Sequence, residues 1–152
     1  MAKTKNKFYS NQRDNFLFLK TVDLIASGVV EPSSLSNEYI RRILSNKELL
    51  KKKSYRCHTI GYMFAITQSE EIQRRILEDN DLRGFKVTTD GKSMAHIIAA
   101  NPASDRIKSI ILSEKKLDLI KDDNGNTVSS MLVIYPHYEH EITDMLRTEL
   151  ND

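Results

Sequence analysis

Two histidines, a lone cysteine and a run of acidic residues are the side chains in this sequence that could carry chemistry. His137 and His140 flank Glu139, and a spacing of three can place two imidazoles on one face of a helix, as a metal site needs. No third ligand stands at a defined distance, and Pro136 indicates a turn at this point. We therefore expect a solvated turn here and no metal site.

The only cysteine, Cys57, is followed directly by His58. Adjacent side chains rarely face each other, and a thiol needs a positioned base before it acts as a nucleophile. A structural thiol is therefore the expected role. A single cysteine also excludes an intramolecular disulfide and an all-cysteine zinc site, and it fits a reducing compartment.

The acidic stretch Asp122–Asn126 matches part of a calcium-binding loop, but Met131 stands where that loop requires a glutamate. A hairpin turn is the better interpretation. The sequence contains no phosphate-binding glycine loop, no dinucleotide fingerprint and no hydrolase or zinc-protease motif. We therefore expect a protein that is not an enzyme and that has no cofactor.

Charge is distributed unevenly along the chain. Residues 1–57 carry 12 Lys and Arg against 5 Asp and Glu, a net charge of +7, whereas residues 58–152 carry 11 against 16, a net charge of −5. The strongest basic run is Lys51, Lys52 and Lys53, beside Tyr55. This run could contact phosphate or an acidic partner, or it could simply be a solvated loop.

The elements that must position these residues are predicted to be helices. The 152 residues include only 5 Gly and 3 Pro, and Leu, Ile, Lys, Arg and Glu are abundant, which favours helix over sheet. The N-terminal residues lack the apolar core of a secretory signal, and no apolar run is long enough to span a bilayer. We expect a cytoplasmic protein that makes no membrane contact.

Internal repetition is the strongest organising feature of the sequence. Arg41–Leu44 recurs 33 residues later as Arg74–Leu77, at the end of a stretch with the apolar spacing of a helix. Gly91–Ala99 aligns at a spacing of 34 with Cys57–Ala65 and with Gly125–Val133. Thr59, Ser93 and Thr127 coincide in this alignment, each just before an apolar run, where a hydroxyl caps a helix.

This pattern resembles the ankyrin repeat. The stretch Gly91–Ala99 is similar to the family's G-x-T-P-L-H-x-A-A, and the period of 33–34 residues agrees. The family's Pro is missing throughout, and its His is present only at His96, with Tyr62 and Ser130 at the matching positions. Cys57 replaces the family's tight-turn glycine. The resemblance implies that His96 is a structural group that bonds across the junction between helix and loop.

The resemblance implies an all-α fold: a short ankyrin-like helical solenoid of about 3.5 repeats with an irregular N-terminal helical pair. Residues 1–13 are predicted to form a flexible basic arm, and 14–152 a single domain with clear repeats at about 53–86, 87–120 and 121–152. One predicted N-terminal helix covers Asn15–Ser27, and a second runs from Ser36 to about Leu50. Another α-solenoid or a helical bundle remains an alternative, to be recognised by loops without hairpin geometry.

The resemblance also implies a function. Ankyrin repeats bind proteins through their loops and the concave row of first helices, so we expect a non-catalytic protein-binding module that acts as an inhibitor, adaptor or effector and occludes its target. The alternative is a nucleic-acid-binding protein that uses the basic N-terminal half. The expected partner-binding residues are Tyr55, Arg56, His58, Ile66, Thr67, Thr89, Asp90, Lys92, Asn101, Asp123, Asn126 and Tyr135, with Lys51, Lys52 and Lys53 as candidate contacts to phosphate or an acidic partner.

Overall fold

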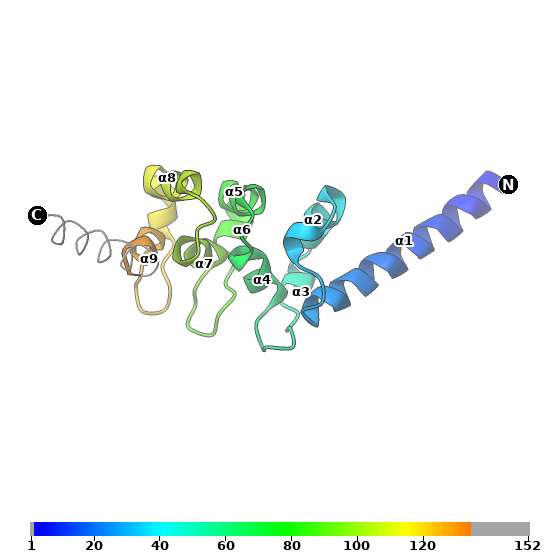
Figure 1. Cartoon of the computed structure of the whole chain (residues 1–152), viewed down its shortest axis with the longest axis horizontal. Coiled ribbons are helices and arrows are strands. Elements are labelled where there is room, and N and C mark those ends of the chain that lie inside the picture. Colours follow the sequence, from blue (N-terminus) through cyan, green and yellow to red (C-terminus); the bar gives the residue numbers. More distant parts are fainter. Residues whose placement is uncertain (1, 135–152) are drawn as a thin grey trace, which may run out of the picture.

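The structure is a computed structural model that describes the backbone of residues 2–134 and the side chains of residues 12–132. Over the described backbone the chain is helical and contains no β-strand, so the predicted all-α class is confirmed. Figure 1 shows an elongated molecule in which the helices follow one another along the long axis.

The helices form two rows. One row consists of the seven-residue helices α4 (Ile60–Ile66), α7 (Met94–Ala100) and α9 (Val128–Ile134). The other consists of α2 (Asn37–Leu44), α5 (Glu70–Glu78) and α8 (Asp105–Ser113). A loop precedes each helix of the first row, and the three loops project to the same side of the molecule (Figure 1).

Hydroxyl groups cap the helices of both rows, as the sequence predicts for the first row. Thr59 accepts a hydrogen bond from the backbone amide of Tyr62 at 3.1 Å, and Thr127 accepts one from Ser130 at 3.3 Å. Ser36, Ser69 and Ser104 cap α2, α5 and α8 in the same way. Each cap satisfies one of the amides that a helix start leaves unpaired.

A short helical turn follows each helix of the second row and is absent from the sequence-based prediction. These turns are α3 (Lys47–Leu50), α6 (Asn80–Arg83) and the 3₁₀ helix η2 (Lys115–Leu119). The prediction of one helix from Ser36 to about Leu50 is wrong, because the side chain of Asn46 accepts from the amides of Glu48 and Leu49 and starts a new helix.

The N-terminal helix α1 (Ala2–Ala26) is longer than predicted. Residues 2–13, predicted as an arm, continue this helix, because no Gly or Pro interrupts the chain before Gly28. Its buried face consists of Phe18, Val22 and Ile25, whereas Phe16 and Leu17 are exposed. The 3₁₀ helix η1 (Pro32–Ser34) then leads to α2.

Contacts between aromatic rings and a guanidinium fix α1 against α2. The rings of Phe18 and Tyr39 meet edge to face with centroids 5.3 Å apart, and the guanidinium of Arg42 lies 3.9 Å from the centroid of the Phe18 ring. The carbonyl oxygen of the Asn15 side chain accepts from Arg42 at 3.1 Å. These contacts therefore hold the two helices of the irregular N-terminal pair together.

A fully buried glutamine, Gln73 of α5, links the end of α4 to the turn between α7 and α8. The amide nitrogen of Gln73 donates to the carbonyls of Ala65 at 3.0 Å and Asn101 at 2.9 Å. Its oxygen accepts from the backbone amide of Ala103 at 2.8 Å. Every polar atom of this side chain is therefore used, as burial requires, and the apolar core on either side is continuous.

Candidate functional site

The three loops that project from the first row of helices are small hairpins. Each is closed by one antiparallel bridge, between Lys53 and Thr59, Lys86 and Ser93, and Lys121 and Thr127. The residue at the bend has a left-handed backbone in every hairpin: Cys57 (φ 65°), Gly91 (φ 82°) and Gly125 (φ 80°). Cys57 therefore has the same backbone conformation as the two glycines with which it aligns in the sequence.

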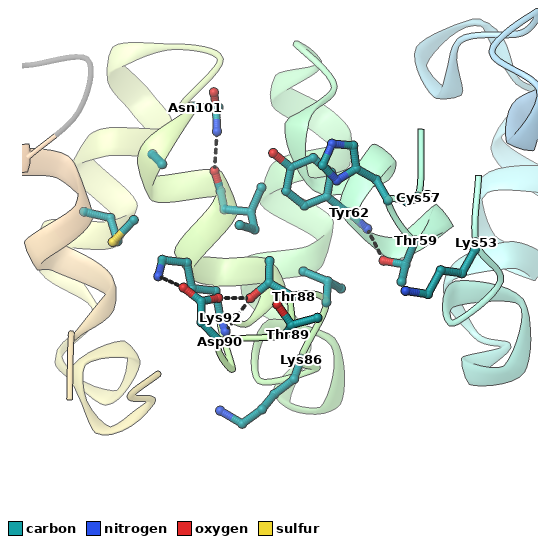
Figure 2. A pocket seen from close by; sticks show the side chains of 15 residues that line it. Lys53, Cys57, Thr59, Tyr62, Lys86, Thr88, Thr89, Asp90, Lys92 and Asn101 are labelled. Atoms are coloured by element: carbon teal, nitrogen blue, oxygen red, sulfur yellow. Dashed lines mark hydrogen bonds and ion pairs between the residues drawn. The ribbon is translucent and has the colours of Figure 1, made fainter. Parts of the chain in front are cut away.

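A groove of about 680 Å³ lies between the first and second hairpins and the ends of α4 and α7 (Figure 2). Its apolar surface comes from Val87, Ile97, Ala100 and Met131, and its polar surface from the two hairpins. Met131 belongs to α9, so residues from three successive repeats meet in this groove. Residues from two hairpins and three helices therefore line it.

A stacked pair of rings forms one wall of the groove. The imidazole of His58, in the first hairpin, lies over the ring of Tyr62, in α4, with centroids 4.3 Å apart and planes inclined by 14°. Figure 2 shows Tyr62 on the helix side of the groove, across from the second hairpin. Two rings held in contact offer a rigid surface that loses little conformational entropy on binding.

The lysines near the groove differ in how their charge is used. Lys52 forms an ion pair with Asp23 of α1 at 2.5 Å, which lowers the pKa of the Asp23 carboxyl, and Lys51 lies 3.9 Å from Glu48. Lys53 lines the groove, and no carboxylate among the described residues lies within ion-pair distance of it. Two lysines of the basic run therefore lie beside carboxylates, and Lys53 is the one that lines the groove.

Lys92 is held by two carboxylates and stiffens the second and third hairpins. Its ammonium lies 2.5 Å from Asp90 and 3.0 Å from Asp122, whose side chain is completely buried. The hydrogen bond with Asp90 raises the pKa of Lys92 and lowers that of Asp90. Burial opposes ionisation of Asp122, but hydrogen bonds from Asn126, Lys92 and the amide of Asn124 hold its pKa well below the ordinary range.

His96 has the structural role that the resemblance implies. The Nδ1 atom accepts from the backbone amide of Ser93 at 3.2 Å, so the proton resides on Nε2, which donates to the carbonyl of Asn126 at 2.8 Å. Burial lowers the pKa of the imidazole and keeps it neutral. The side chain has no exposed surface and cannot reach a ligand.

Five of the predicted partner-binding residues line the groove: His58, Thr89, Asp90, Lys92 and Asn101. Tyr55 and Arg56 lie elsewhere. The amide of Tyr55 donates to the carbonyl of Ala26 at 2.8 Å, and the Arg56 guanidinium lies 5.2 Å from the Tyr55 ring centroid. Tyr55 therefore joins the first hairpin to the end of α1, and Arg56 lies against its ring.

The predicted contact at Thr67 is wrong, because only 6% of this residue is exposed. Ile66 is half-buried against the core. Asn126 is half-buried and bonds to Asp122 and His96 within the molecule, whereas Asp123 is exposed on the third hairpin. Tyr135, and with it His137 and His140, lies outside the described residues.

Sequence reasoning missed Tyr62, Lys86 and Thr88 as groove residues. Tyr62 occupies the position that is His96 in the next repeat, but it points into the groove instead of the core. Lys86 precedes its hairpin bend at the position that Lys53 and Lys121 occupy in theirs, so a comparison of the bridge positions could have found it.

No family model matches the chain, and no curated protein or solved structure was found to be similar to it. In the described part of the chain, His, Cys, Asp and Glu form no group of three that could hold a metal ion. Over the same residues, no helix combines the length and the apolar character needed to cross a bilayer.

Proposed function

We propose that this protein is a non-catalytic protein-binding module of the ankyrin type, and that the groove between its first two hairpins is the centre of the binding surface. The repeated hairpins, each with a left-handed bend before a capped helix, support the ankyrin interpretation. The groove carries the functional part of the proposal, because it collects exposed side chains from successive repeats on one side of the molecule.

Most ionisable groups near the groove hold the structure together, and this also favours binding over catalysis. His96, Asp90, Lys92 and Asp122 are engaged in hydrogen bonds or ion pairs that hold the hairpins. A general base or nucleophile would need a positioned partner and access to a substrate atom. His58, which is exposed, stacks on Tyr62, and no carboxylate in the described part of the chain forms an ion pair with it.

The test is affinity capture from the cells that make the protein, followed by quantitative mass spectrometry. The double variant His58→Ala plus Tyr62→Ala removes the ring pair, and Arg74→Ala plus Arg106→Ala on α5 and α8 serves as the control. We expect a protein that the wild type and the control retain and the groove variant loses by about tenfold or more. Equal recovery with all three baits would refute the groove as the binding surface.

Circular dichroism of each bait checks that the variants remain folded. The ring pair is a safe target in this respect, because His58 is exposed and Tyr62 is only half-buried. Binding to nucleic acid is the alternative outcome, and it predicts a gel shift that weakens steeply with salt. The ion pair between Lys52 and Asp23 leaves less free positive charge for that function than the sequence suggests.

A further inference from the structure

We infer that the groove recognises an extended acidic segment of a protein partner, with carboxylates that meet Lys53 and Lys86 and a small apolar side chain that contacts the groove. This inference rests on the proposed function and specifies the chemistry of the partner. It follows from the charges that the groove leaves unneutralised, from the fixed position of one of them, and from the apolar surface between the hairpins.

The ammonium of Lys86 is held in place without being neutralised. It donates to the carbonyl of Gly91 at 2.8 Å and to the carbonyl of Lys121, in the third hairpin, at 3.1 Å. No carboxylate of the described residues forms an ion pair with it. An ammonium has three donors, so one remains for a ligand, and the position of the charge is already fixed before binding.

Lys53 supplies the second positive charge from the first hairpin. It occupies the bridge position that Lys86 occupies in the second hairpin, and both side chains line the groove (Figure 2). The remaining charged pair in the groove, Lys92 with Asp90, is internally balanced. The net charge that the groove offers to a ligand is therefore positive and comes from two separate hairpins.

The groove also carries a small apolar surface. Ile97 and Val87 are almost completely buried, and only parts of their side chains reach the groove beside Ala100. A short apolar side chain fits such a surface, whereas a bulky ring does not gain much contact there. The hydroxyl of Thr89, in the second hairpin, borders this area and can donate to a carboxylate or a backbone carbonyl, whereas that of Thr88 already donates to Asp90.

The same features favour a protein segment over nucleic acid. A phosphate backbone carries a charge at every nucleotide, and it would meet the half-exposed carboxylate of Asp90 in the same groove. Stacking of bases would need a free aromatic face, but one face of Tyr62 is already covered by His58. An acidic peptide can space its carboxylates so that they avoid Asp90.

The experiment is selection from a random peptide library displayed on phage, carried out in parallel on three proteins. These are the full-length wild type, the groove variant Lys53→Glu plus Lys86→Glu, and the control Lys47→Glu plus Lys115→Glu. The control changes the net charge by the same amount, but its lysines lie on α3 and η2, outside the groove. Binding of selected synthetic peptides is then measured by fluorescence anisotropy.

We expect the wild type and the control to select peptides rich in Asp and Glu. The groove variant should bind these peptides about tenfold or more weakly and should itself select basic peptides. An unbiased or apolar consensus, in peptides that lose affinity for the His58→Ala plus Tyr62→Ala variant, would overturn the acidic inference and leave the proposed function intact. Peptides that bind all variants equally would overturn both, and so would a failure to select any peptide together with a gel shift of a ribo-oligonucleotide.

Discussion

A cysteine in the left-handed backbone region is the most unusual residue of the hairpins. Cys57 has φ 65°, whereas Gly91 and Gly125 hold this conformation at the matching bends. A side chain in this region costs about 1–2 kcal/mol relative to glycine, because Cβ approaches the following carbonyl oxygen. The surrounding bridge and caps therefore impose the bend on Cys57 against its own preference.

Replacement of this cysteine by glycine should stabilise the protein. We expect Cys57→Gly to raise the free energy of unfolding by about 0.5–1 kcal/mol, after the greater entropy of glycine in the unfolded chain is deducted. Urea denaturation measures the change. Gly91→Ala is the opposite control: alanine at φ 82° is strained, and its Cβ would also meet the Asp123 carboxylate, so stability should fall. A loss of stability in Cys57→Gly would show that the thiol makes favourable contacts.

The buried imidazole of His96 should make stability depend on pH. Its pKa is lowered in the folded state from the ordinary value of 6.5, so below this pH the unfolded state binds a proton that the folded state resists. The free energy of unfolding should therefore decrease as the pH falls through about 6.5. A second decrease should follow below about pH 4, where the unfolded form of Asp122 becomes protonated and the folded form does not.

Urea titrations at about pH 7.5 and about pH 5.5 measure the first of these effects. In His96→Gln the difference between the two conditions should shrink, although the variant is less stable overall because it loses the bond to Asn126. His58→Gln is the matched control, since His58 is exposed and its loss should leave the difference unchanged. An equal pH effect in wild type and His96→Gln would refute the assignment.

At the scale of elements, local signals predicted the capped helices, and tertiary contacts decided the rest. Thr59, Ser93 and the serine caps could be recognised because each satisfies amides within its own helix. The helix break at Asn46 was missed, because an Asn inside an apolar pattern also fits a continuous helix. The groove wall at Tyr62 was missed, because whether this ring faces core or solvent depends on the neighbouring hairpin.

The three short turns after the second-row helices should each depend on their polar cap. The carboxylate of Asp79 accepts from the amides of Asp81 and Leu82 at 2.9 and 3.0 Å, and Asn46 has the same role in the preceding repeat. We expect Asn46→Ala and Asp79→Ala each to lower the free energy of unfolding by about 1 kcal/mol. Lys47→Ala, at the exposed neighbouring position, should have almost no effect. Thermal denaturation of the three variants distinguishes these outcomes.

At the scale of the whole molecule, stability should come from contacts between successive repeats. A helical pair buries its apolar face only against its neighbours, so the junctions decide whether the array unfolds as one unit. Gln73 lies at such a junction, and it joins the end of α4 to the turn between α7 and α8. The loss of this side chain therefore tests the coupling more directly than the loss of a core methyl group.

We expect Gln73→Ala to lower the free energy of unfolding by about 2–3 kcal/mol, because it leaves buried backbone groups without partners. Hydrogen exchange should then report different opening free energies for α2–α5 and α7–α9, which we expect to exchange together in the wild type. Gln68→Ala is a close control, since Gln68 also donates to the Asn101 carbonyl, at 3.2 Å, but is exposed. Uniform exchange across the chain in Gln73→Ala would show that the coupling lies elsewhere.

The bonds between repeats join residues that are close along the chain. His96 and Asn126 are 30 positions apart, Lys86 and Lys121 are 35 apart, and Gln73 and Asn101 are 28 apart. Closing such short loops costs little entropy, and helical proteins with local contacts fold quickly. Each repeat also needs only the one before it as a docking surface. During synthesis on the ribosome, the chain can therefore fold from its N-terminal end as each repeat emerges, before the rest has been made.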